Sequence, residues 1–162
     1  ITGCLNELAF VPVDFRTNAP VDEWSGEIGC GVQYFSQQAV ARLLPPAGIK
    51  VDSSLPEAKK LVEVQRLMDK GDERAGKIYE TIGVYLGYTI AWFDEYYRMK
   101  NVSLMGRVMT GAGGNIIRES AQRVLQAEFP DLRKRITFYE PSEQEKRHGQ
   151  AVAAATLAPL GG

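Results

Sequence analysis

The residues best placed to do chemistry are four small ones in a row: Gly111, Ala112, Gly113 and Gly114. They follow an apolar stretch, residues 102–110, that predicts a buried strand, and Asn115 then offers a cap for a helix. A helix start exposes unpaired N–H groups, and glycines remove the side chains that would keep a ligand away from the backbone. In open α/β sheets, ligands sit at the carboxyl ends of strands. The run therefore indicates contact with the ribose and phosphate of a nucleotide, or more simply a tight turn from strand to helix.

The residues around this run exclude several better-known sites. No Gly-Lys-Ser or Gly-Lys-Thr follows, so the run is not a Walker loop, and its spacing is not Gly-x-Gly-x-x-Gly. The pattern Gly-x-Ser-x-Gly is absent, so hydrolase chemistry has no support. His148 is the single histidine, and a chain with one histidine cannot supply a histidine-rich metal site. We expect this side chain to face solvent.

Four carboxylates crowd one loop of the sequence: Asp14, Asp22, Glu23 and Glu27. They could form a sugar or metal site, but a solvated loop is the simpler interpretation. The two cysteines, Cys4 and Cys30, are too few for a disulfide framework, so we expect small buried hydrophobes in a reduced, cytoplasmic setting.

The candidate site residues must be positioned by the secondary structure around them, most of which the sequence predicts to be helical. Apolar residues predict helices over residues 33–44 and over residues 56–69, the first ended by two prolines. Asp72 is a plausible cap for a third helix, residues 73–98, whose apolar residues recur at spacings of three and four. Gly83 and Gly87 lie four residues apart on it and would let another element approach closely.

The remaining segments indicate an α/β domain. Residues 1–13 suggest a hairpin fragment, residues 135–139 a short strand, and residues 143–157 a closing helix rich in small residues. The order strand, loop, helix, strand, helix is typical of α/β layering. The 162 residues fit one domain, and 44% are hydrophobic and 24% charged, as in globular chains. A net charge of −1 gives no electrostatic case for nucleic acid or a membrane surface as partner.

Three segments, in order along the chain, resemble the repressor/ORF/kinase (ROK) family of sugar kinases. Residues 6–13, NELAFVPV, are similar to the family's Gly-Glu-Ile-Gly-His-Met-Pro-Val segment, and residues 26–36 are similar to its zinc segment. The glycine run, the helix after it, a short strand and the small residues 149–155 resemble the end of that family. There a hydrophobic strand runs into a Gly-Gly loop beside the adenosine.

The resemblance implies the carboxy-terminal lobe of an actin/hexokinase/heat-shock ATPase superfamily protein. It implies a ribonuclease H-like α/β fold over residues 1–162: a mixed sheet with helices on both faces and a helical insert at about residues 33–70. Gly111, Ala112, Gly113 and Gly114 would contact ATP, with Mg²⁺, in an intact two-lobe protein, and Glu7 would face a sugar hydroxyl. The family's catalytic Asp and both phosphate loops lie in the amino-terminal lobe. We therefore expect no catalytic residue in this chain and no turnover by it alone.

Departures from the family pattern keep other functions open. Phe10 stands in place of a zinc- or sugar-binding His, and Val32 in place of a sugar-binding Glu. Of three expected zinc cysteines only Cys30 remains, so no zinc is expected. The alternative is a non-catalytic module: a sugar-responsive transcriptional regulator or a degenerate ATPase-like ligand-binding protein. A third interpretation is that the chain is a subunit-interaction domain, in which the helix over residues 73–98 forms the dimer face.

Overall fold

The structure is a computed structural model that describes residues 8–23, 25–142 and 144. Its described elements are helices and one small parallel sheet, so the predicted α/β class is confirmed. Where the sequence predicts a hairpin fragment over residues 1–13, the described part instead contains the short helix η1 (Leu8–Phe10), and residues 1–7 lie outside the described residues. The helix predicted over residues 143–157 lies outside them except for residue 144. None of the described helices combines the length and the apolar character that crossing a bilayer requires.

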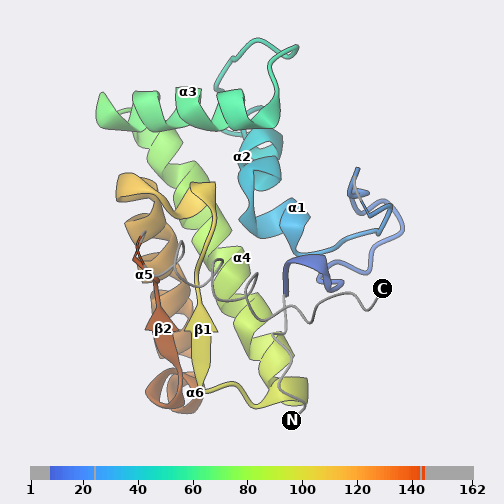
Figure 1. The fold of residues 1–162 in the computed structure, drawn as a ribbon, viewed down its shortest axis with the longest axis vertical. Helices are drawn as coiled ribbons and strands as arrows, with labels where there is room; N and C mark the ends of the chain where they lie inside the picture. The colour runs from blue at the N-terminus through green and yellow to red at the C-terminus, as the bar shows by residue number, and fades with distance from the viewer. Residues whose placement is uncertain (1–7, 24, 143, 145–162) are drawn as a thin grey trace, which may run out of the picture.

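The long helix α4 (Glu73–Tyr97) is the axis of the fold, as the apolar spacing predicts (Figure 1). Asp72 caps it, because its carboxylate accepts a hydrogen bond of 3.0 Å from the N–H of Arg74. The helix ends at Arg98, which adopts the left-handed conformation (φ 43°) that often closes a helix. Ile78, Ile82 and Ile90 lie on its buried face.

Three shorter helices precede α4, in the region predicted as a helical insert: α1 (Val32–Phe35), α2 (Gln37–Leu43) and α3 (Glu57–Asp69). The single helix expected over residues 33–44 is two helices, because Ser36 is extended (φ −105°, ψ −171°) and interrupts it. The Ser36 hydroxyl then caps α2 by accepting from the N–H of Gln38 at 3.0 Å. In Figure 1, α3 crosses the upper end of α4, with α2 and α1 below it on one side.

A strand–helix–strand unit completes the described fold. It consists of β1 (Asn101–Ser103), the short helix η2 (Arg107–Met109), α5 (Gly111–Glu128), α6 (Pro130–Arg135) and β2 (Thr137–Tyr139). The two strands are parallel, and Val102 lies opposite Phe138. The strand expected over residues 102–110 is therefore wrong in length. The described residues form a sheet of only these two strands. The larger mixed sheet that the resemblance implies therefore stays a prediction.

Helices α4 and α5 lie side by side because two glycines let their backbones meet (Figure 1). A Cβ atom added at Gly83 would lie 2.5 Å from the carbonyl oxygen of Ile117 and 2.5 Å from the Cβ of Ser120. One added at Gly87 would lie 2.8 Å from the Cβ of Val124. The close approach expected from the Gly83–Gly87 spacing is thus the approach of α5.

Alanine at Gly83 or Gly87 should destabilise the protein, by about 1–3 kcal/mol, because a methyl group would force two packed helices apart. Gly76, on the same helix, is the matched control, since a Cβ added there meets nothing within 4 Å. Gly76→Ala should be neutral or stabilise by up to about 1 kcal/mol, the usual gain of helix propensity. Urea denaturation measures all three, and equal effects at the three positions would contradict the packing.

Candidate functional site

The glycine run forms the first turn of α5, and its four residues have two different surroundings. Gly111 and Ala112 are exposed, and Gly111 has φ +67° with nothing within 4 Å of an added Cβ. Gly113 is buried, and a Cβ there would lie 2.4 Å from the ring of Tyr79. At Gly114 it would lie 2.0 Å from the carbonyl oxygen of Met109. Packing within the chain therefore accounts for the missing side chains at Gly113 and Gly114, while the first two residues face open space.

Strand β1 ends at Ser103, earlier than the sequence predicts. The first glycine after the strand is therefore Gly106 and not Gly111. Gly106 follows the strand with φ 110° and ψ 166°, a conformation that favours glycine, and an added Cβ there would meet nothing within 4 Å. Sequence reasoning missed it by placing it inside a strand. A glycine within a strand pattern is itself a signal of a bulge or of close backbone approach, and it could have identified this turn.

Beside β1 the structure has a groove of about 920 Å³, which is within the usual size of ligand sites. Its floor comes from α4 and α5, through Leu86, Ile90 and Ile117. One wall is β1 and the turn after it, including Gly106, and the facing wall is α1 with the start of α2. Figure 1 shows the elements that supply these residues, with α4 passing between β1 and α1. Most of the groove surface is apolar, so it suits a largely apolar ligand.

Polar side chains also line the groove. Thr89 is buried in it, while Ser36 and Asn101 contribute from its two walls. Among the described residues that line the groove, Arg107 is the one basic residue, and it directly follows Gly106. Asp22 and Glu57 are the acidic ones. Burial, together with the nearby Glu23 and Asp22 carboxylates, raises the pKa of Glu57 above its usual range.

Asp22 is part of a hydrogen-bonded loop that holds its shape through side chains. It is 1% exposed, and its carboxylate accepts hydrogen bonds of 2.8 Å from both the N–H and the hydroxyl of Ser25. Gln38 donates to the other carboxylate oxygen at 3.0 Å. For Asp22 the expected solvated loop is therefore wrong, because these donors replace water. Glu23 and Glu27 are exposed, as expected.

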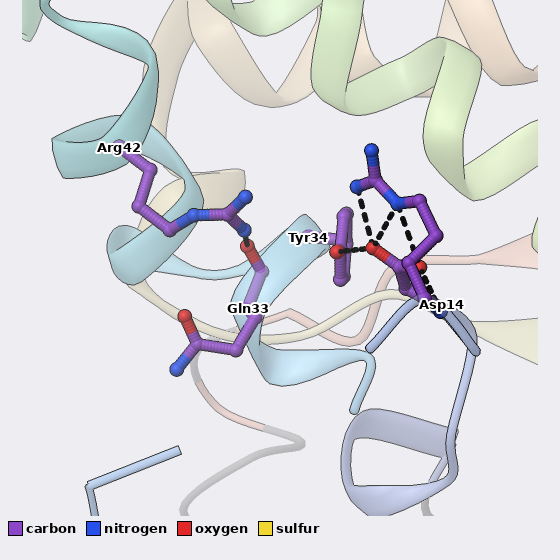
Figure 2. Close-up of polar contacts among 5 residues, drawn as sticks. Asp14, Gln33, Tyr34 and Arg42 are labelled. Atoms are coloured by element: carbon purple, nitrogen blue, oxygen red, sulfur yellow. Dashed lines mark hydrogen bonds and ion pairs between the residues drawn. The ribbon is translucent and has the colours of Figure 1, made fainter. Parts of the chain in front are cut away.

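Asp14 anchors the preceding segment to α1 (Figure 2). Its carboxylate accepts from Arg16 at 2.6 Å and from the hydroxyl of Tyr34. These two donors hold the pKa of Asp14 well below its usual range. Burial, and then the hydrogen bond to Asp14, raise the pKa of Tyr34, so this hydroxyl stays protonated and can donate. On the far side of the same ring, the Arg42 guanidinium lies 4.9 Å from the centroid and donates to the carbonyl of Gln33 at 2.7 Å.

The four loop carboxylates do not form one site. Asp14 and Asp22 take separate hydrogen-bonding partners. Within residues 8–23, 25–142 and 144, no three His, Cys, Asp or Glu side chains come together as a metal would require. Cys30 is fully buried, which confirms the prediction for that cysteine. Phe10, 46% exposed, and Val32 both line the groove, whereas Glu7 lies outside the described residues.

No protein-family model, curated protein sequence or solved structure matches this chain.

Asp14→Asn should lower the free energy of unfolding at pH 7 by about 1 kcal/mol, the usual value for such a hydrogen bond after solvent screening. Because the folded-state pKa of Asp14 is depressed, its contribution is fully present above the unfolded pKa of about 4 and is lost progressively as pH falls from there toward the folded pKa. Urea unfolding at several pH values should show the two proteins converging in acid. Asp131→Asn is the control, since this carboxylate is 95% exposed; an equal loss in both variants would contradict the assignment.

Proposed function

We propose that this chain is the nucleotide-binding lobe of a two-lobed, ROK-like, ATP-dependent sugar kinase, with adenosine in the groove beside β1. The observation that carries the proposal is that Gly106, at the carboxyl end of a parallel strand, lies on the wall of a ligand-sized, mostly apolar groove. The resemblance of the sequence to the ROK family supports the same assignment.

The topology favours this end of the sheet for a ligand. Strands β1 and β2 are parallel and are joined through α5, so their carboxyl ends lie at one edge. Ligands of open α/β sheets bind outside that edge. Gly106 carries no side chain there, so the backbone of the turn is open to an approaching ribose.

The charges of the groove favour a nucleoside over a bare phosphate inside it. Asp22 and Glu57 would repel a phosphate, whereas the Glu57 carboxylate can accept a hydrogen bond from a ligand hydroxyl; that of Asp22 is buried and already bonded to Ser25 and Gln38. The phosphates of ATP would instead leave past Arg107, the basic side chain next to Gly106. The exposed Gly111 and Ala112 remain candidates to contact them, and we assign Gly113 and Gly114 to helix packing.

Phosphoryl transfer would need the other lobe. It depends on placing the reacting groups and on stabilising charge around Mg²⁺, and the family's base and phosphate loops belong to the amino-terminal lobe. We therefore propose that this chain contributes adenosine binding and part of the substrate cleft, with Glu7 facing the sugar, and that it does not turn over by itself.

Isothermal calorimetry of the 162-residue chain should detect weak nucleotide binding. We expect adenosine and ATP to bind with Kd values on the order of 1 mM, about −4 kcal/mol, and within roughly fivefold of each other. The two should be similar because most phosphate contacts would come from the other lobe. Undetectable adenosine binding up to about 10 mM would contradict the proposal.

A matched pair of variants locates the binding. Met105 lines the groove and Val62 lies on α3 away from it, and both side chains are 52% exposed. Met105→Glu adds a charge to the apolar wall and should weaken adenosine binding by about tenfold or more, about 1.4 kcal/mol. Val62→Glu should leave it unchanged. Equal affinities in the two variants would place adenosine somewhere else.

A further inference from the structure

The outward face of α4 carries aromatic side chains where a surface helix normally carries polar ones. Tyr88, Trp92 and Tyr96 follow one another at intervals of four residues and are 44%, 43% and 64% exposed. Phe15, 74% exposed, joins them from the loop before α1. We call these four residues the aromatic stripe. Nearer the start of the helix the same side is polar, with Lys77 and Glu80.

Each ring of the aromatic stripe is held in place by a neighbouring side chain. Phe15 and Trp92 pack edge to face, with ring centroids 6.1 Å apart and ring planes at 71°. Trp92 and Tyr96 do the same, with centroids 5.3 Å apart and planes at 73°. Tyr88 packs against Phe129 and donates its hydroxyl to Glu128. Such contacts fix the side chains before any partner arrives, which lowers the entropic cost of association.

The geometry of the stripe favours a protein partner over a carbohydrate. A sugar ring stacks on a flat aromatic platform, whereas rings inclined by 71° and 73° to their neighbours form ridges and hollows. Ridges suit interdigitation with another set of side chains, and Tyr and Trp are the residues that concentrate binding energy in protein interfaces.

The exposed area is large enough for a specific contact between two copies. Taking about 200 Å² for a fully buried aromatic side chain, the four exposed fractions leave roughly 450 Å² of aromatic surface per copy. A two-fold pair would bury about twice that. Val84, 38% exposed on the same face, and the rim of the contact add to it. The total reaches about the 1,000 Å² expected of a biological interface, and a two-fold contact uses the same patch on both copies.

We propose that a second copy of this chain packs on the aromatic stripe, with the two α4 helices antiparallel about a two-fold axis near Trp92. In this arrangement Tyr88 of one copy lies toward Tyr96 of the other. The stripe is built from α4 and the loop before α1, and its four residues do not line the groove beside β1. The dimer contact and the proposed nucleotide site therefore use different residues, and each has its own test.

Sedimentation velocity over a range of about 1 to 200 μM should show the 17.9 kDa chain forming a dimer. Trp92→Glu should shift the midpoint of dimerisation by at least about tenfold in concentration, because it places a charge at the centre of the contact. Tyr96→Glu, at the more exposed edge, should do the same without touching the core. Val62→Glu, an exposed residue on α3, should dimerise like the original protein.

Far-ultraviolet circular dichroism checks that each variant is folded. Because Tyr96→Glu tests the same contact, the result does not depend on Trp92→Glu alone. In a Trp24→Phe background the emission of Trp92 should shift to the blue as the concentration rises through the dimerisation midpoint. A chain that stays monomeric throughout, or a dimer that persists in both Trp92→Glu and Tyr96→Glu, overturns the proposal. A monomer whose Trp92 emission responds to an oligosaccharide overturns it in favour of a carbohydrate.

Discussion

The close contact of α4 with α5 is the constraint on which the rest of this fold depends. Gly83 and Gly87 allow the α5 backbone to approach α4 at distances that a methyl group would block. Because α5 connects β1 to β2, this approach also fixes where the parallel pair lies over the two helices. The floor of the groove follows directly, since α4 supplies Leu86 and Ile90 to it and α5 supplies Ile117.

A second helix-to-helix contact sets the beginning of α5. The ring of Tyr79 on α4 occupies the space left by Gly113, and it is fully buried. Burial raises the pKa of Tyr79 to about 12, so this hydroxyl stays protonated at any physiological pH. The hydroxyl has no hydrogen-bond partner in the described part of the chain. Burying it without a partner costs folding free energy, which the close packing of the ring against α5 must offset. The start of α5 is thereby packed against α4 at Tyr79 and against the short helix η2 at Met109.

The sequence allowed the helices to be predicted better than the site. Local rules sufficed for α4, because its apolar period and the Asp72 cap are both visible along the chain. The end of β1 could not be placed, since the apolar run over residues 102–110 fits a strand until Gly106 turns the chain. The partner of Gly113 is Tyr79, more than thirty residues earlier, and no local pattern connects them. Asp22 is similar, because donors from Ser25 and Gln38 bury a carboxylate that composition alone places in solvent.

The groove and the turn at its edge carry the functional account, so the most direct measurement follows backbone amide signals of the ¹⁵N-labelled chain during titration with adenosine. The account predicts saturable shifts concentrated on the turn around Gly106, on neighbouring β1, and on the stretch of α4 around Thr89 that lines the groove. Shifts confined to other surfaces, or none up to about 10 mM adenosine, would contradict it.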